Sequence, residues 1–104
     1  MSAIRIPKGG SPTPPGEMLL EEFLKPLSMT QTELARRIGV DYVRVNEIVH
    51  GKRRVTPSTA LRLGKLFGTT PEFWLSVQLA TDLYEVSHDA REAEELARIQ
   101  PIAG

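Results

Sequence analysis

The sequence predicts an all-α domain, a bundle of five to six helices, and two observations support this fold class. Apolar residues recur at helical spacing in several segments between residues 15 and 84 of the 104. These segments begin at a proline or a capping residue, and most end at a glycine or proline, which is the punctuation typical of helices. Alternation of apolar and polar residues, the mark of a strand, is confined to Ile4 and Ile6 near the N-terminus.

The chain before residue 15 is expected to be a flexible arm. Residues 9–14 are a run of glycine, serine, threonine and proline, which disrupts regular structure. Ile4 and Ile6 could add a short strand to the edge of a partner's sheet, whereas a disordered terminus is the simpler interpretation. The sequence therefore divides into an arm at 1–14, a domain at 15–88 and an acidic helix or tail at 89–104.

The first two helices are marked by residues at their ends. The first is predicted to begin at Pro15, whose ring sets the backbone angle of a helix start, and to end at Pro26. The second begins after Thr30, because Thr30 and Glu33 form a capping box: the hydroxyl accepts a backbone N–H and the carboxylate reaches back. It ends at Gly39, a residue type that readily adopts the left-handed conformation after a helix.

A third helix is predicted after Asp41, a favourable N-cap. It ends at Gly51, and its apolar residues Val45, Ile48 and Val49 are expected to face the core.

The remaining helices carry the same signals. Thr56-Pro57 opens a fourth helix that ends at Gly68, and Thr70-Pro71 opens a fifth. Asp89 caps a last, polar helix that ends before Pro101. The apolar residues at helical spacing are Ala60, Leu61, Leu63, Leu66 and Phe67 in the fourth helix and Phe73, Trp74, Val77, Ala80, Leu83 and Tyr84 in the fifth.

Basic and acidic residues are equal in number, thirteen each, but they are unevenly distributed. Residues 31–67 contain eight basic and three acidic residues, a net charge of +5. Residues 68–104 contain two basic and seven acidic residues, a net charge of −5. This asymmetry predicts a basic working face, suited to nucleic acid, and an acidic tail.

The segment 30–54 predicts a helix-turn-helix. Gly39 and Val40 form too short a connection for the flanking helices to run antiparallel, so the helices must cross steeply. In such a pair the first helix braces against the DNA backbone and the second enters the major groove. The expected outer face of the second helix presents Tyr42, Arg44 and Asn46, which can hydrogen-bond base edges, together with Val43.

Phosphate contacts are expected from two neighbouring positions. The turn Lys52-Arg53-Arg54 follows the second helix directly and can neutralise phosphates. Gln31, at the start of the bracing helix, can donate a hydrogen bond to a phosphate in the same orientation.

Two long stretches of this chain resemble a known family. TQTELARRIGV (30–40) and EIVHGKRRVTPSTALRLGKLFGTTPEFWL (47–75) are similar to the helix-turn-helix repressors of the phage-repressor (Xre) class, whose fold is lambda-repressor-like. The start PPGEMLLEEFLKPLSMTQ narrows the resemblance to HigA-type antitoxins. The resemblance covers residues 14–80.

The resemblance implies a dimeric repressor that binds a palindromic double-stranded operator in its own promoter. It also implies a HigB-type toxin as partner, an enzyme that cleaves messenger RNA on the ribosome. Carried over position by position, it implies DNA contacts by Gln31, Tyr42, Val43, Arg44, Asn46, Lys52, Arg53 and Arg54. A stand-alone Xre-family repressor without a toxin and a protein–protein adaptor that does not bind DNA are the alternatives.

The fifth helix predicts a homodimer. Its large apolar side chains are more than the end of one small domain readily covers, so one edge of the helix is expected to form a two-fold interface. Two-fold symmetry would place the two recognition helices about 34 Å apart, one turn of DNA. The residues predicted for this interface are Phe73, Trp74, Val77, Ala80 and Tyr84.

The toxin is expected to meet either the acidic tail or the arm with Ile4 and Ile6. A toxin that holds RNA must be basic, so the carboxylates of Glu92, Glu94 and Glu95 would complement it. A solvated helix face is the plainer interpretation of the same residues.

Neither catalysis nor a metal or other cofactor is expected. Glu47 with His50, and His88 with Asp89, offer only pairs of ligands, whereas zinc usually takes at least three from the protein. The chain has no cysteine, no phosphate-binding P-loop and no nucleophile elbow. It also has no signal peptide and no membrane-spanning apolar run, which favours a cytoplasmic protein without a membrane partner.

Overall fold

The computed structural model describes residues 10–102, and they form helices joined by short loops. No strand occurs within this range, so the predicted all-α class is confirmed for the part of the chain that is described. The segment with Ile4 and Ile6 lies outside the described residues. In chain order the elements are α1 (Pro15–Leu19), the π-helical turn η1 (Leu20–Leu24), α2 (Gln31–Ile38), α3 (Tyr42–Val49), α4 (Pro57–Phe67), α5 (Pro71–Ser87) and α6 (Ala90–Leu96).

The predicted caps form at the helix ends. Thr30 Oγ1 accepts a hydrogen bond from Glu33 N at 3.0 Å, and Asp41 Oδ1 accepts one from Arg44 N at 3.0 Å. Gly39 follows α2 with a φ of 75°, the left-handed conformation that glycine adopts without strain. One detail of the capping box is wrong, because the Glu33 carboxylate accepts a hydrogen bond from Arg37 Nε at 2.9 Å and does not reach back to Thr30.

The core gathers around Trp74 of α5, whose side chain is fully buried. The Phe23 ring lies 5.0 Å from the Trp74 ring and 4.8 Å from the Phe67 ring, measured between centroids. The indole N–H donates to Thr69 Oγ1 at 2.8 Å, so the one polar atom of the indole is paired. Leu61, which shares the apolar pattern of α4, is 60% exposed and lies outside this core.

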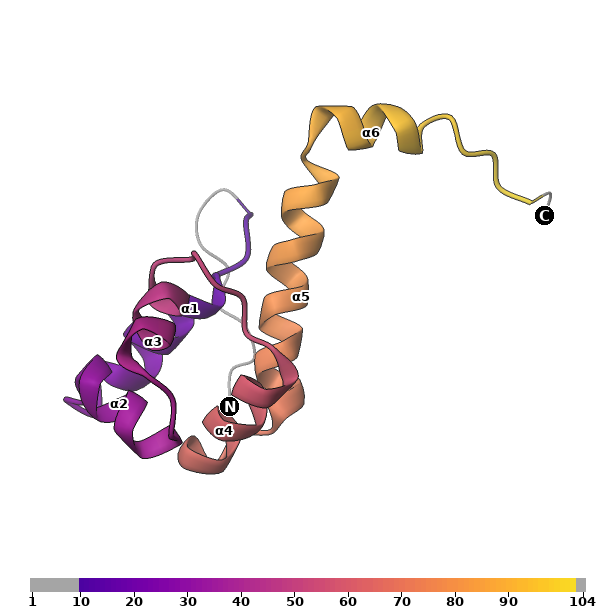
Figure 1. The fold of residues 1–104 in the computed structure, drawn as a ribbon. Coiled ribbons are helices and arrows are strands. Elements are labelled where there is room, and N and C mark those ends of the chain that lie inside the picture. The colour runs from indigo at the N-terminus through magenta and orange to yellow at the C-terminus, as the bar shows by residue number, and fades with distance from the viewer. Residues whose placement is uncertain (1–9, 103–104) are drawn as a thin grey trace.

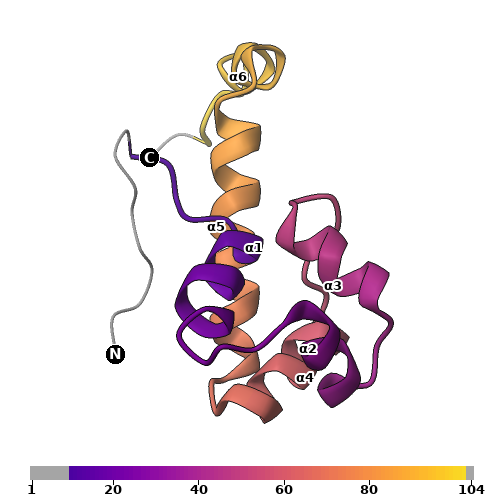
Figure 2. The same cartoon turned by 90° about the vertical axis from the view of Figure 1, so that its left-hand side faces the viewer.

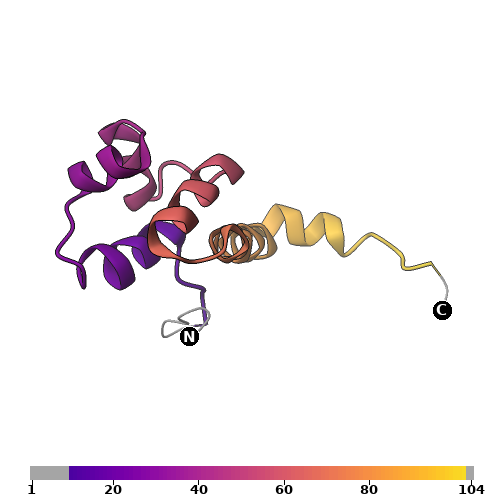
Figure 3. The ribbon, with the colours of Figure 1, turned by 90° about the horizontal axis from the view of Figure 1, so that it is seen from below.

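Helices α1 to α4 and the first half of α5 form a body from which the rest of α5 projects (Figure 1). Figure 2 shows α5 from the side, with α6 at its far end. Seen from below, α6 points away from the side of the molecule that holds α2 and α3 (Figure 3). Residues 90–96 include no buried side chain, so α6 lies beyond the reach of the core.

The predicted boundary of the arm is wrong for its last residues. The Thr13 side chain is fully buried, and Ser11, Pro12 and Pro14 are half-buried. Ser11, Pro12 and Pro14 line a hollow that also borders Tyr84 of α5. Residues 11–14 are therefore packed on the domain, because prolines and a small buried threonine can lie flat against a helix.

Gly16 marks the closest backbone approach between α1 and α3. A Cβ at this position would lie 2.1 Å from Ile48 O and 2.5 Å from Val49 O, distances that atoms cannot occupy. Glycine is therefore required here for packing, and the contact sets the distance between α1 and the C-terminal end of α3.

Gly16→Ala is expected to lower the free energy of unfolding by about 1–3 kcal/mol, since the added methyl group must push α1 away from α3. Urea unfolding followed by the fluorescence of Trp74 measures the change. Ser76→Ala, at an exposed position of α5, is the matched control and should leave stability nearly unchanged. Equal stability of the two variants would contradict this account of Gly16.

Candidate nucleic-acid interface

α2 and α3 form the helix pair expected within residues 30–54 and pack against each other. Arg62 of α4 supports their connection, because its Nη1 donates to Ile38 O at 2.6 Å and to Gly39 O at 3.5 Å. These bonds satisfy carbonyls that the end of α2 leaves without a helical partner. The turn between the helices is thus fixed from the α4 side.

The two faces of α3 divide as predicted. Val45 and Ile48 are buried, and Val49 is half-buried against the core. On the opposite side, Tyr42 is 47% exposed and Val43 is 56% exposed. This outer face is therefore open to a ligand.

Arg44 is half-buried on α3, one turn above Asp41. Its side chain forms no salt bridge within residues 10–102. The planar guanidinium can therefore give paired donors to the acceptors of a guanine edge without first breaking an ion pair.

A hydrogen-bond network joins three of the predicted site residues. Asn46 Nδ2 donates to Gln31 Oε1 at 3.1 Å and to Tyr42 OH at 3.2 Å. The network ties the start of α2 to the exposed face of α3, across 15 residues of sequence. Side chains that are already held in place lose less conformational entropy when they bind.

The turn after α3 is held by a backbone hydrogen bond and by the side chain of Arg53. Gly51 has a φ of 75°, and Lys52 N donates to Glu47 O at 2.8 Å. Arg53 Nε donates to Glu47 Oε1 at 2.8 Å. Lys52 is exposed and forms no salt bridge in the described part of the chain, whereas Arg53 must share its charge with Glu47.

Arg54 is bound to α5. Its Nη2 lies 2.5 Å from Asp82 Oδ2, and its Nη1 donates to Asp82 Oδ1 at 3.2 Å. Gln78 reinforces the contact, because its Nε2 donates to Asp82 Oδ1 at 3.0 Å while its Oε1 accepts from Val55 N at 2.8 Å. Arg54 therefore fixes the end of the turn to α5, a role that the run of basic residues in the sequence did not predict.

The ion pair also shifts the pKa of both partners. The hydrogen bonds from Arg54 lower the pKa of Asp82 from its usual 3.8, with a smaller contribution from Gln78 in the same direction. The bond to Asp82 raises the pKa of Arg54, which stays charged. Gln78 and Asp82 were absent from the predicted site, because nothing local in the sequence connects them to the turn.

The stripe predicted for the dimer interface is only partly on the surface. Trp74 and Val77 are fully buried in the core of their own chain, so their assignment to an interface is wrong. Phe73 also packs on the core, while Ala80 and Tyr84 are half-buried. The exposed apolar residues of α5 are Leu79, Leu83 and Val86, which lie on a neighbouring face.

Among the described residues, no group of three or more His, Cys, Asp or Glu side chains could hold a metal ion. Glu47 instead pairs with Arg53, and His50 Nδ1 lies 2.8 Å from Asn46 O. The described helices are also too short or too polar to cross a membrane.

Comparison with known proteins places this geometry among DNA-associated relatives. A helix-turn-helix family model matches residues 20–74. YbaQ, an uncharacterised helix-turn-helix-type transcriptional regulator of Escherichia coli K12, is 44% identical over 92 residues, which are 88% of this chain and 81% of YbaQ. Antitoxin HigA-1 of Vibrio cholerae is 37% identical over 91 residues, 88% of this chain and 84% of HigA-1. A structure of the Pseudomonas aeruginosa antitoxin HigA with the higBA promoter matches with a TM-score of 0.81 and 32% identity, covering 88% of this chain and 98% of the antitoxin.

Asp82→Asn is expected to lower the urea midpoint of unfolding at pH 7, because a neutral amide cannot replace the ion pair with Arg54. The folded-state pKa of Asp82 lies below 3.8, so its stabilisation is fully present above that value. It is lost as the pH falls through the folded-state pKa, and the two proteins should then converge.

Urea titrations over a pH series measure this difference. Glu72→Gln, an exposed change at the start of α5, is the control for loss of a carboxylate. If the difference in urea midpoint between wild type and Asp82→Asn persisted unchanged in acid, the ion pair could not be its source.

Proposed function

This chain belongs to the helix-turn-helix family, and we propose that it is an antitoxin that binds its own operator as a homodimer. In this proposal it represses its own operon in the cytoplasm and neutralises a HigB-type toxin that cleaves messenger RNA on the ribosome. The observation that carries the DNA-binding part is the exposed face of α3, where Arg44, which forms no salt bridge among the described residues, lies beside the Gln31–Asn46–Tyr42 network.

The recognition helix of the proposal is α3. Arg44 and Tyr42 read base edges in the major groove, Asn46 assists them, and Val43 lies alongside. Gln31 donates to a phosphate, a role supported by its hydrogen bond: because Gln31 Oε1 already accepts from Asn46, its Nε2 is left as the donor.

The phosphate contacts of the proposal come from the turn after α3. Lys52 is exposed without an ion pair among the described residues, and Arg53 can exchange Glu47 for a phosphate. Arg54 is left out of the contact set, since it binds Asp82 through two hydrogen bonds.

The homodimer of the proposal uses the exposed side of α5. Leu79, Leu83 and Val86 are 50–61% exposed and recur at helical spacing along one side of the helix. A projecting helix with such a stripe is a self-complementary surface for a two-fold partner. The dimer would present two copies of α3 to inverted half-sites.

The toxin part of the proposal rests on the similarity to antitoxin HigA-1 of Vibrio cholerae. Glu94 and Glu95 of α6 are exposed and Glu92 is half-buried, so this helix could attract a basic protein, and the segment with Ile4 and Ile6 is the other candidate contact. A stand-alone repressor is the second candidate function, favoured by the higher identity to the transcriptional regulator YbaQ.

Arg44→Ala is expected to cost about 1–3 kcal/mol of operator binding and to relax the preference at one base position, because one base loses its paired donors. Arg53→Ala should instead weaken binding to all DNA sequences alike. It should also flatten the slope of log binding constant against log salt concentration by about one unit. Arg54→Ala should weaken binding by releasing the turn from Asp82, but it should leave the salt slope unchanged, because Arg54 contacts no phosphate in this proposal.

Gel-shift or anisotropy titrations on operator and scrambled DNA, each at several salt concentrations, measure the affinity and the salt slope of all three variants. If Arg44→Ala weakened specific and scrambled DNA equally, Arg44 would not be a base-reading residue. A flatter slope for Arg54→Ala would return Arg54 to the phosphate contacts.

Affinity purification of the tagged chain from its native cells is expected to recover a small basic protein encoded beside it, in stoichiometric amount. Expression of that protein alone should arrest growth, and co-expression of this chain should restore growth. Recovery of operator DNA without any such protein would favour the stand-alone repressor.

A further inference from the structure

Helix α6 has an apolar side that the described part of the chain leaves partly exposed. Leu96 is 49% exposed, and Ile99 just beyond the helix is 67% exposed. A helix of seven residues is too short to be stable in water without packing. Leu96 therefore gives α6 an apolar group with which it can pack against a further surface.

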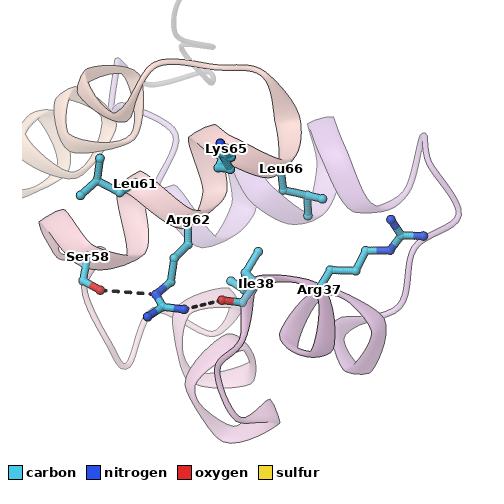
Figure 4. A pocket seen from close by; sticks show the side chains of 7 residues that line it. All are labelled: Arg37, Ile38, Ser58, Leu61, Arg62, Lys65 and Leu66. Atoms are coloured by element: carbon cyan, nitrogen blue, oxygen red, sulfur yellow. Dashed lines mark hydrogen bonds between the residues drawn. The ribbon is translucent and has the colours of Figure 1, made fainter.

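A groove between α2 and α4 offers a surface of complementary character. It has a volume of about 530 Å³ and is shown in Figure 4. Leu61, Arg62 and Lys65 all belong to α4. The Arg62 side chain reaches across to α2 and binds Ile38 O, while Leu61 is 60% exposed. The lining residues are Arg37, Ile38, Ser58, Leu61, Arg62, Lys65 and Leu66.

The spacing of charges and apolar groups on the two helices matches. On α4, Leu61 and Lys65 are four residues apart and lie on one face; on α6, Glu92 and Leu96 are also four apart. Antiparallel packing would set Leu96 against Leu61 and the Glu92 carboxylate against the Lys65 ammonium. Neither Lys65 nor Glu92 forms a salt bridge within residues 10–102.

The groove and α6 of one chain are held apart by α5. Its 17 residues extend about 25 Å at 1.5 Å per residue, with α4 at one end and α6 at the other. A two-fold axis perpendicular to α5 and lying between two copies of it places the start of α5 in one chain beside the end of α5 in the other. In an antiparallel pair of α5 helices, α6 of each chain therefore arrives beside α4 of the other.

We propose that α6 docks in the α2–α4 groove of a second copy of this chain, with Leu96 on Leu61 and Glu92 on Lys65. The inference rests on the homodimer proposed above and adds a reciprocal contact to it. Because the groove is built on α2, the partner's α6 packs against the helix-turn-helix itself. Dimerisation would then stabilise the bracing helix directly.

Cysteine cross-linking tests the contact cleanly, because the sequence contains no cysteine. A Leu61→Cys chain and a differently tagged Leu96→Cys chain are co-expressed, purified without DNA or toxin, and treated with a mild oxidant or a short bismaleimide. A covalent heterodimer is expected. Leu61→Cys paired with Glu94→Cys, on the other side of α6, is the matched control and should give several-fold less product.

A charge exchange gives a second measurement that does not depend on cysteine geometry. Lys65→Glu and Glu92→Lys should each weaken the dimer about two- to fivefold in sedimentation, and the double variant should recover the loss. Glu94→Lys is the control and should not be rescued by Lys65→Glu. Additive weakening in the double variant would overturn the pairing.

The outcomes separate this inference from the proposed function. A dimer in sedimentation that gives no more Leu61–Leu96 product than the control overturns the docking of α6 but leaves the homodimer and DNA binding intact. A monomer at all concentrations overturns both the docking and the dimer. Cross-linking that requires a co-purified toxin would assign α6 to the toxin and also overturn the docking.

Discussion

The backbone contact at Gly16 is the constraint on which the position of the recognition helix depends. Because α1 carries no side chain there, it lies directly against the carbonyls of Ile48 and Val49 at the end of α3. Helix α1 packs on both α3 and α5, so it holds α3 in place relative to α5. A larger residue would separate these helices and move the outer face of α3 relative to the rest of the domain.

The features that the sequence predicted are those with a local cause. Thr30 and Asp41 cap the helices that directly follow them, and Gly39 ends α2 in the left-handed conformation with its N–H on Ala35 O. The bracing of the turn could not be predicted in this way, because Arg54 and Asp82 are 28 residues apart. The periodicity of α5 likewise predicted one apolar side. It could not show that Trp74 and Val77 fill the core or that Leu79, Leu83 and Val86 form a second, exposed side.

The pairing of cations changes the meaning of the charge pattern. The excess of basic residues in 31–67 suggests a uniformly basic face, yet Arg37, Arg53 and Arg54 each have a carboxylate partner. Such pairs cancel much of the long-range field, so in the proposed complex the attraction to DNA would depend more on Lys52, which forms no salt bridge among the described residues. In the proposal, base reading depends instead on donors with fixed geometry, and the hydrogen bonds of Asn46 to Gln31 and Tyr42 supply that fixed geometry.

Helix α5 connects the two halves of the proposed function. On one side Gln78 and Asp82 hold Val55 and Arg54, and so fix the end of the cationic turn. On another side Leu79, Leu83 and Val86 are exposed, and they form the proposed dimer surface. A shift or rotation of α5 on dimerisation would therefore reach the turn directly, through the buried Gln78 and through Asp82. If the chain forms the proposed dimer, this bracing would link the geometry of the dimer to the position of the turn, and so to the spacing between the half-sites that the dimer reads.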